Sequence, residues 1–485
     1  MFWQYLILTI YTISLTLILI FSISQAYLIY FYLRGKNKNE PKQLVFEELP
    51  LVTVQLPLYN ELYVVERLMN AVCNLNYPIE KLEIQVLDDS DDESFLLTKQ
   101  LIEQKKKQGF QIEHITRKKN IGFKAGALQC GLQCAKGEFI AIFDADFIPE
   151  REFINQLLPY FKDNVGMVQS RWGHLNENYS LLTKVQAFAL DAHFTIEQKG
   201  RSKGDLCINF NGTAGIWRKS CIADAGGWQY DTLTEDLDLS YRAQLKGWKF
   251  EYVETVSTPA ELPAELNAFR SQQHRWTKGA VETSKKMLTP IWKEENSFKK
   301  KIFATFHLCN SYIFILVFLT GVISVPVVYI KNLNQISALY FQIISIYLVG
   351  FIIVCIFYSV AYFSKKKSFV EFIMLFPMFL SVSMAMSFHN SIAVLEGVFG
   401  FKTAFIRTPK FNFNHFNIGF KNNKYLNRAL PLSFYAELVL SFYFLSALSL
   451  SIYYRDFSLF PFHLMLCIGY FTLVFYGVKQ RWTLE

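Results

Sequence analysis

Long apolar segments at both ends of the chain constrain its fold more than any other feature. Residues 2–32 are almost entirely apolar, and further apolar stretches follow after about residue 300. Each of them is long enough to cross a bilayer as a helix, which takes about 20 residues. A hydrophobic content of 52% agrees with an integral membrane protein. The mixed stretch between the apolar segments is therefore expected to form a globular domain.

We predict five membrane spans. Residues 2–32 are interpreted as an uncleaved anchor, because this apolar run is longer than that of a signal peptide and no basic residue precedes it. The other predicted spans are 302–330, 336–363, 430–454 and 459–478. A further apolar stretch, 369–398, contains Glu371, His389, Asn390 and Glu396. Ionisable groups are costly inside a bilayer unless they face protein or water, so this stretch is set apart from the spans.

Basic residues beside the spans indicate the orientation of the chain. They follow the first span, precede the second and follow the third: Arg34, Lys36 and Lys38; Lys299, Lys300 and Lys301; Lys365, Lys366 and Lys367. Because Lys and Arg concentrate in short cytoplasmic loops, we expect all three clusters in the cytoplasm, the amino terminus outside and the carboxyl terminus inside. Residues 402–428 are also basic, so both flanks of 369–398 are expected on the cytoplasmic side, and that stretch is interpreted as an interfacial or re-entrant helix. The alternative is a sixth span with residues 402–428 outside.

Charge and cysteine content exclude some other classes of function. The formal net charge of +8 is explained by the basic cytoplasmic loops, with some attraction to anionic lipid headgroups, and no basic stripe points to nucleic acid. Cys130 and Cys134 lie four residues apart, but no second pair stands at the spacing of zinc ligands. The cysteines are therefore expected in the core.

The globular stretch alternates between predicted strands and helices. Continuous apolar runs at 51–56, 82–87, 112–116 and 139–143 are typical of buried parallel strands. The segments between them, at 61–75, up to about 108, and at 123–135, have helical spacing. We therefore expect a doubly wound α/β sheet of Rossmann type, in which ligands bind beyond the carboxyl ends of the strands.

Acidic residues fall at those strand ends. Asp88 and Asp89 end one predicted strand, and Asp144 and Asp146 end another. This places four carboxylates near one crevice, which surface charge alone does not explain. Carboxylate oxygens suit a hard divalent cation, and such a cation stabilises a leaving diphosphate.

Two further motifs have both a structural and a functional interpretation. Residues 120–128 read N-I-G-F-K-A-G-A-L, a glycine turn into a helix, where Lys124 could reach a phosphate or the turn could simply cap the helix. Thr234, Glu235 and Asp236 could be a helix N-cap with acids in the first turn, or could supply a base that accepts a proton from an attacking hydroxyl.

The segment 272–277, Q-Q-H-R-W-T, completes the series. An aromatic ring can stack on a pyranose, and an arginine offers phosphate a planar fork of donors. In order along the chain, these motifs resemble the D, D-x-D, T-E-D, Q-x-x-R-W signature of processive family 2 glycosyltransferases, the group of the cellulose, chitin, mannan and hyaluronan synthases. The resemblance covers roughly residues 52–280 and looks closest to the plant-type cellulose-synthase-like branch that includes mannan and xyloglucan-backbone synthases.

The resemblance implies an α/β GT-A (Rossmann-like) catalytic domain joined to an α-helical transmembrane region. The expected parts are an anchor at 1–34, a cytoplasmic GT-A domain at 45–290 and a transmembrane region at 291–485. The last part would include the interfacial helix at about 369–398 and a segment at about 400–412 that resembles the gating loop of cellulose synthase. There, F-I-R-T-P-K at 405–410 is similar to F-x-V-T-P-K, with Arg407 in place of the usual Val.

The resemblance also implies residue roles. Nucleotide-sugar contacts are expected from these residues, with Asp88 on the uridine or guanosine: Asp88, Asp89, Lys124, Asp144, Arg275, Thr408 and Lys410. Mg²⁺ or Mn²⁺ would be held by Asp146, with Asp144. Asp236 would be the catalytic base, with Glu235 beside it. Contacts to the acceptor sugar are expected from Gly212, Thr213, Gln272 and Trp276.

These expectations describe an inverting hexosyltransferase of the inner or plasma membrane, a multi-pass protein with a cytoplasmic catalytic domain. It would transfer a hexose from UDP-glucose or GDP-mannose to the nonreducing end of a growing β-linked glycan, which the helices would export. Its partners would be the nucleotide sugar, the glycan and the lipid bilayer, and export partner proteins are compatible with this interpretation. The alternative is a non-processive lipid glycosyltransferase that makes a glucosyl diacylglycerol or ceramide. Thr408, Pro409, Lys410 and the number of spans favour the synthase, and a transporter would leave the acidic motifs unexplained.

Overall fold

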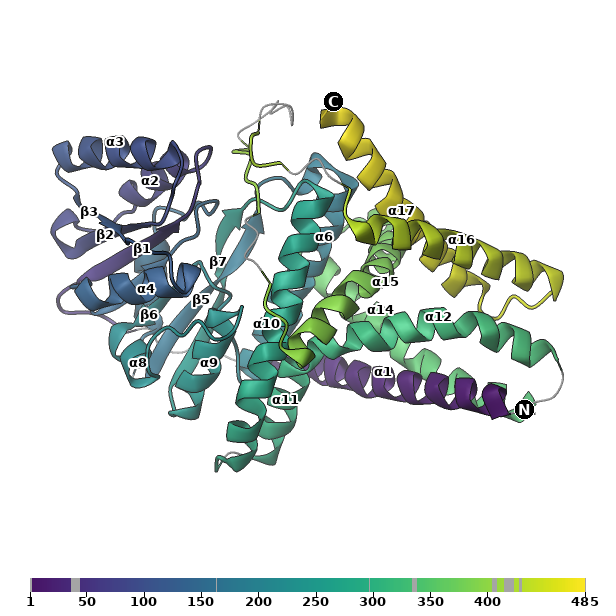
Figure 1. Ribbon diagram of the computed structural model, residues 1–485. Helices are drawn as coiled ribbons and strands as arrows, with labels where there is room; N and C mark the ends of the chain where they lie inside the picture. Colours follow the sequence, from purple (N-terminus) through teal and green to yellow (C-terminus); the bar gives the residue numbers. More distant parts are fainter. Residues whose placement is uncertain are drawn as a thin grey trace.

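The computed structural model describes residues 2–35, 44–162, 164–295, 297–333, 338–403, 408–413, 423–426 and 430–484. Lys36, Lys38, Phe405, Ile406 and Arg407 lie outside these ranges, as does part of the basic segment 402–428. A mixed α/β domain at one end is joined to a bundle of long helices at the other, with helix α10 between them (Figure 1).

The α/β domain is built on one sheet of seven strands in the order β3-β2-β1-β4-β6-β5-β7. The strands are β1 (Val52–Leu58), β2 (Leu82–Asp88), β3 (Gln111–Thr116), β4 (Phe139–Ile142), β5 (Val165–His174), β6 (Gly215–Arg218) and β7 (Lys249–Ala260). Strands β3, β2, β1 and β4 are parallel neighbours, at the positions that the apolar runs predict. The predicted α/β fold is therefore confirmed for this half of the sheet.

The other half of the sheet departs from a purely parallel arrangement. Strand β6 pairs antiparallel with β4 on one side and with β5 on the other, and β5 then pairs parallel with β7. The sheet is thus mixed, because the four-residue strand β6 runs antiparallel to both of its neighbours, β4 and β5.

Helices cover both faces of the sheet. Helices α2 (Val65–Cys73), α3 (Ser94–Lys107) and α5 (Phe153–Leu157) contribute to one apolar core, and α4 (Phe123–Cys134), α8 (Lys219–Asp224) and α9 (Glu235–Leu245) contribute to the core on the opposite face. The predicted helix at 61–75 is shorter than expected, because residues 61–64 form a turn before α2. The two cores together fix the strand ends that carry the acidic motifs.

Six helical segments of the described chain are long and apolar enough to cross a membrane. They are Phe2–Gly35, Asn310–Asn332, Ala338–Phe363, Phe369–Phe399, Leu432–Tyr453 and Phe460–Trp482. They correspond to α1 (Phe2–Gly35), α12 (Ile313–Asn332), α13 with α14 (Ala338–Ile344, Leu348–Phe363), α15 (Phe369–Phe399), α16 (Leu432–Tyr453) and α17 (Phe460–Leu484). By length and composition alone, the stretch 369–398 thus qualifies with the five predicted spans.

The predicted span at 302–330 begins too early. Residues 298–308 form a separate helix, α11 (Phe298–Leu308), and the apolar helix starts only at Asn310. Helix α11 packs on the α/β domain, where Ala304 and Leu308 share a core with Leu237 and Tyr241. Its apolar residues therefore pack on the domain, on the helix α10 (Leu266–Lys293) and, through Phe303, on α1, which explains why their hydropathy resembled that of a span.

The long helices have two distinct ends. At the end far from the α/β domain, Lys331 Nζ lies 2.8 Å from Asp456 Oδ2, and Tyr340 shares a hydrogen bond of 2.8 Å with Thr12. Helix α15 differs from the other helices, because both of its ends lie near the domain. In its first turn, the ring of Phe372 lies 6.2 Å from that of Phe188, and in its last turn Glu396 lies 2.9 Å from His274 of α10.

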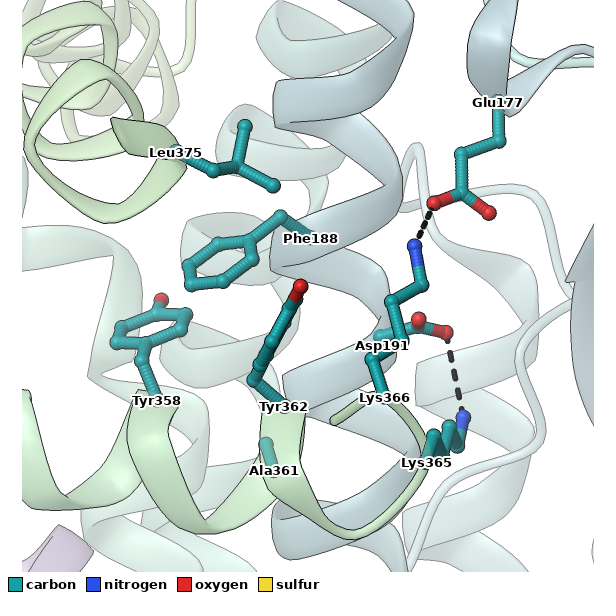
Figure 2. A pocket seen from close by; sticks show the side chains of 9 residues that line it. All are labelled: Glu177, Phe188, Asp191, Tyr358, Ala361, Tyr362, Lys365, Lys366 and Leu375. Carbon is teal, nitrogen blue, oxygen red and sulfur yellow. Dashed lines mark hydrogen bonds and ion pairs between the residues drawn. The ribbon is translucent and has the colours of Figure 1, made fainter. Parts of the chain in front are cut away.

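The junction between domain and bundle combines aromatic packing with ion pairs (Figure 2). Phe188, on helix α6 (Leu181–Ala192), stacks against Tyr358 of α14 with ring centroids 5.3 Å apart. Beside this contact, Lys366 pairs with Glu177, and Lys365 Nζ lies 3.3 Å from Asp191 Oδ1. The basic residues after α14 therefore anchor the domain-side end of that helix.

Candidate active site

One pocket gathers most of the motifs that the sequence analysis singled out. Its walls are the carboxyl ends of β1, β4, β5 and β7, the start of α9, helix α10 and residues 408–410. The lining includes these predicted site residues: Asp89, Lys124, Asp144, Asp146, Gly212, Glu235, Asp236, Gln272, Arg275, Trp276, Thr408 and Lys410. The expected position beyond the strand ends is the position observed.

Lys124 lies at the centre of the charged part of the pocket. Its Nζ is 2.5 Å from Asp144 Oδ1 and 4.0 Å from Glu235 Oε1, and it donates to Gly212 O at 2.9 Å. Burial lowers the pKa of Lys124, but the charges of Asp144 and Glu235 outweigh burial and raise it overall. The lysine is therefore a fixed positive charge between the two acidic motifs, which suits an anionic ligand.

The turn before α4 holds Lys124 in place. Arg117 forms a two-point ion pair with Asp89, in which Nε lies 2.9 Å from Oδ1, and it also donates to the carbonyls of Ile121 and Phe123. Gly122 has φ +75°, a conformation that glycine adopts without strain. Asp89 thus lines the pocket and, through Arg117, holds the turn before α4 in place.

Asp236 has the electrostatic character of a base. Burial, followed by the charge of Glu235, raises the pKa of Asp236 from its ordinary value of 3.8 to about 7, and Lys124 opposes this increase. The carboxylate also accepts a hydrogen bond from its neighbour Leu237 N at 2.8 Å. A side chain whose pKa lies near neutral pH accepts and releases protons efficiently. Thr234 stands at the N-cap position of α9, but its hydroxyl pairs with Thr283 and makes no cap bond.

Gly212 and Thr213 have different positions. A Cβ atom on Gly212 would lie 3.0 Å from Asp236 Oδ2, and its φ is +82°, so this position requires glycine. Thr213 is 1% exposed and lies outside the pocket lining. Its Oγ1 accepts the backbone N–H of Asp144 at 2.9 Å. Thr213 thus supports the Asp144 turn, and its expected contact with the acceptor stays a prediction.

Asp88 lies outside the pocket lining and is 2% exposed. It contacts His114 Nε2 at 3.0 Å and Ser90 N at 3.0 Å, so it orders the loop after β2. Its expected contact with the nucleotide stays a prediction. Adjacent residues of a strand point to opposite sides, so Asp89 faces the pocket while Asp88 faces away.

Helix α10 brings three predicted residues to one wall of the pocket. Gln272, Arg275 and Trp276 line it together with Trp172 from the end of β5. The two tryptophan rings have centroids 6.4 Å apart, which forms an aromatic surface beside the charged groups. Such a surface suits the apolar face of a sugar ring.

Thr408 and Lys410 form another part of the pocket wall. Lys410 Nζ lies 2.7 Å from Asp146 Oδ2, so the lysine contacts the aspartate that the resemblance assigns to the metal. The Thr408 hydroxyl oxygen is buried and has no hydrogen-bond partner among the residues that the structure describes. Residues 405–407 of the predicted gating loop lie outside those residues.

The donor set for a metal is small but chemically suitable. Within the described ranges, no group of three or more His, Cys, Asp or Glu side chains could hold a metal ion. Asp144 and Asp146 nevertheless present carboxylate oxygens to one pocket. Two carboxylates fit a hard cation such as Mg²⁺ or Mn²⁺ that takes its other ligands from substrate phosphates and water.

Some pocket residues were missed by the sequence analysis. The Nε1 of Trp172 and the Nδ2 of Asn211 are buried polar atoms at the pocket wall without a hydrogen-bond partner among the described residues. Glu261 and His174 also line the pocket. Trp172 and His174 are separated from every motif in sequence, and no pattern marked them. Asn211 precedes Gly212, which the resemblance did mark, but the burial of its amide depends on the tertiary structure.

Comparison with known proteins agrees with this geometry. Residues 50–279 match the family model described as "Glycosyltransferase like family 2". The chain is 42% identical over 276 residues to probable glucomannan 4-beta-mannosyltransferase 4 of Oryza sativa subsp. japonica, covering 55% of this chain and 49% of that protein. It is 40% identical over 278 residues to glucomannan 4-beta-mannosyltransferase 2 of Arabidopsis thaliana, covering 55% and 52%. The chain thus spans about half the length of the curated relatives it matches.

A solved structure shares the fold. It is a mannosyltransferase from Pyrobaculum calidifontis in complex with GDP-Man and Mn²⁺, with a TM-score of 0.55 and 16% identity. The alignment covers 82% of this chain and 100% of that protein. At this level of identity, the likeness supports the GT-A-like fold.

Proposed function

Residues 50–279 are a family 2 glycosyltransferase domain of the cellulose-synthase-like, mannan-synthase branch, and on that premise we propose the activity of the whole chain. The chain transfers a hexose from a nucleotide sugar to the end of a growing β-linked glycan, with inversion at the anomeric carbon. One observation carries the proposal: the Lys124–Asp144 pair and the candidate base Asp236 line the same pocket, on either side of Gly212.

Asp236 is the proposed base. The acceptor hydroxyl oxygen attacks C1 of the donor sugar, its proton passes to the Asp236 carboxylate, and the bond from C1 to the phosphate oxygen breaks with loss of the nucleoside diphosphate. A pKa of about 7 lets Asp236 take the proton near neutral pH. Glu235 contributes by raising that pKa through its charge, and Gly212 leaves room beside the carboxylate.

The donor's diphosphate is proposed to lie against Lys124, with Arg275 and Lys410 as further positive groups on the pocket wall. Asp144 and Asp146 would hold Mg²⁺ or Mn²⁺, which supplies positive charge to the departing diphosphate. Asp89 and Arg117 keep the Lys124 turn in position. The buried, unpaired Thr408 hydroxyl is a further candidate contact to a polar donor group.

The donor sugar is proposed to be mannose, delivered as GDP-mannose. The relatives named above are glucomannan 4-beta-mannosyltransferases, and they match this chain over 276 and 278 residues. The solved relative with the same fold binds GDP-Man and Mn²⁺. UDP-glucose is the competing donor. Trp276 and Trp172 are proposed to bind the acceptor end of the glycan by stacking.

The chain is proposed to cross the membrane five times, with α15 at the cytoplasmic interface. This topology is supported by the contacts at both ends of α15, those of Phe372 with Phe188 of α6 and of Glu396 with His274 of α10. The domain-side ends of α1 and α14 carry Arg34, Lys365 and Lys366, so the domain is proposed to be cytoplasmic. A bacterial-type inner membrane or a plasma membrane, and export of the product along the bundle, belong to the same proposal.

A donor panel tests the activity. Purified full-length chain with Mn²⁺ is incubated with labelled GDP-mannose, GDP-glucose, UDP-glucose and UDP-galactose, and release of the nucleoside diphosphate is followed. GDP-mannose should be consumed fastest. The matched variant Asp236→Asn should still bind GDP-mannose in equilibrium dialysis but lose about 10² to 10⁴ of its turnover, because loss of a general base commonly costs that much.

Two results would count against the proposal. Turnover by Asp236→Asn at the rate of the unaltered protein would remove Asp236 as the base. Equal and negligible turnover of all four donors by folded protein, with the metal present, would remove the proposed reaction class.

A further inference from the structure

Glu261 is a buried carboxylate with no role in the reaction proposed above. It follows directly after β7, and its side chain is 2% exposed. Its Oε2 accepts the backbone N–H of Phe411 at 2.8 Å, and its Oε1 accepts that of Phe413 at 3.0 Å. On its other side, Arg67 of α2 places Nη1 2.7 Å from Oε1. One carboxylate therefore joins the α/β domain to a segment that lies about 150 residues further along the chain.

The local backbone shape brings both donors to the same carboxylate. Asn412, between the two phenylalanines, has φ +57°, a left-handed conformation that asparagine adopts more readily than most residues. A left-handed residue turns the N–H groups on its two sides toward a common anion. Residues 411–413 thus form a small receptor for one carboxylate, and Glu261 supplies it.

Burial makes this contact specific. A buried carboxylate is costly unless hydrogen bonds and an opposite charge compensate for lost water. Arg67 and the two N–H groups provide that compensation together. If the segment left, Glu261 would keep only the arginine, so the docked arrangement is favoured by the domain itself.

The docked segment places Lys410 on the acidic motif. Lys410 precedes Phe411, whose N–H is fixed by Glu261, and its own carbonyl accepts from Asn423 Nδ2 at 2.9 Å. With the backbone held on both sides, Lys410 Nζ lies 2.7 Å from Asp146 Oδ2. Arg67 also reaches the carbonyl oxygen of Asp146 at 3.4 Å, so the same arginine contacts both Glu261 and the turn that carries Asp146.

We propose that Glu261 is a positioning residue that docks the segment 408–413 on the domain and thereby sets the ammonium of Lys410 against Asp146. The assignment of Asp146 as a metal ligand rests on the proposed function. The docking itself does not, because it is a contact between two parts of this chain.

Hydrogen–deuterium exchange of the whole protein in detergent, without donor or metal, tests the docking. In the variant Glu261→Gln, one amide N–H group replaces an acceptor oxygen, so the Phe411 and Phe413 amides lose part of their protection. We expect exchange in the peptide that covers 408–413 to accelerate at least about tenfold, equivalent to about 1.4 kcal/mol. Strand β7 should keep its protection.

Glu265→Gln is the matched control. Glu265 is likewise buried and also accepts two backbone N–H groups, those of Asn267 and Ala268 at the start of α10. Its replacement should accelerate exchange at the start of α10 and leave 408–413 unchanged. A second readout is acetylation of lysines by an amine-reactive reagent: Glu261→Gln should make Lys410 react faster and leave Lys124 unchanged. A purely structural role for Glu261 would not single out Lys410.

The outcomes are distinct. Unchanged exchange at 408–413 in folded Glu261→Gln overturns the proposal, whatever the activity of the protein.

If Glu261→Gln does not fold, Phe411→Pro removes one donor and leaves the buried carboxylate and Arg67 in place. Faster exchange of the Phe413 amide and faster acetylation of Lys410 in that variant support the docking, and unchanged rates overturn it. A failed donor panel with altered exchange refutes only the enzymatic proposal.

Discussion

The pH dependence of turnover follows from the environment of Asp236. A general base works in its deprotonated form, so activity is present above the pKa and is lost as the pH falls through it. With a pKa of about 7, about a tenth of the base is deprotonated at pH 6 and about nine-tenths at pH 8. The kcat/KM for the donor sugar in the presence of acceptor should therefore rise about tenfold between pH 6 and pH 8. An aspartate at its ordinary pKa of 3.8 would give a flat profile over this range.

The variant Glu235→Gln tests why the pKa of Asp236 is raised. Glu235 raises the pKa of Asp236 by its negative charge, so its removal should move the acidic limb to lower pH. Asp231→Asn removes a charge from an exposed position of the same loop, paired with Lys286, and should leave the limb in place. The assay is initial-rate release of nucleoside diphosphate in a constant-ionic-strength buffer series, with donor binding measured separately at each pH. A flat profile in the unaltered protein would exclude a raised pKa for Asp236 as the base, and a limb that Glu235→Gln does not move would exclude Glu235 as its cause.

Three further predictions concern packing and electrostatics. Gly212→Ala should cost roughly 1–2 kcal/mol of backbone strain at φ +82° and crowd the candidate base at 3.0 Å, so turnover should fall about tenfold or more in the donor assay. Arg270→Met leaves Glu437, which is 1% exposed, as an uncompensated buried charge, and should destabilise the protein by roughly 3–5 kcal/mol in a thermal unfolding series, whereas adding Glu437→Gln should recover much of the loss. Lys410→Met removes a cation 2.7 Å from the carboxylate it bonds, so Mn²⁺ alone should bind several-fold more tightly by electron paramagnetic resonance titration, and unchanged affinity would contradict that competition.

Three of the four strands that the sequence predicted, β1, β2 and β4, are buried almost throughout, whereas the edge strand β3 is not. Strand β2 is buried at all seven positions, so its apolar run was an unambiguous signal. Strand β7 alternates exposed and buried residues and includes charged side chains, and β6 has only four residues. Neither pattern stands out against the surrounding loops, and the antiparallel insertion of β6 depends on pairing between segments that are distant in sequence.

The candidate site was predicted where a motif carries its own chemistry. Lys124 and Asp236 line the pocket as expected, although their catalytic roles stay predictions. Which of Asp88 and Asp89 faces the pocket depends on the pleat at the strand end, and both carboxylates look alike in the sequence. Glu261 had no signal, because its partners are backbone N–H groups that any residue can provide.

In the membrane region too, some features could be predicted from the sequence and others could not. Length and composition found the long helices, but they did not distinguish α11, which packs on the domain, from the start of a span. They also did not decide the position of α15, which satisfies the criteria of a span while both its ends contact domain-side residues. Tertiary contacts, which hydropathy does not report, separate these cases.

The size and composition of the product test whether the chain polymerises mannose into a β-linked glycan. Full-length protein in lipid nanodiscs is incubated with Mn²⁺ and GDP-mannose, and the product is analysed by gel filtration and mass spectrometry before and after digestion with a β-mannanase. We expect a long polymer that the β-mannanase degrades to short oligosaccharides. A glycolipid of one or two sugars, with no polymer from any hexose donor, would contradict it.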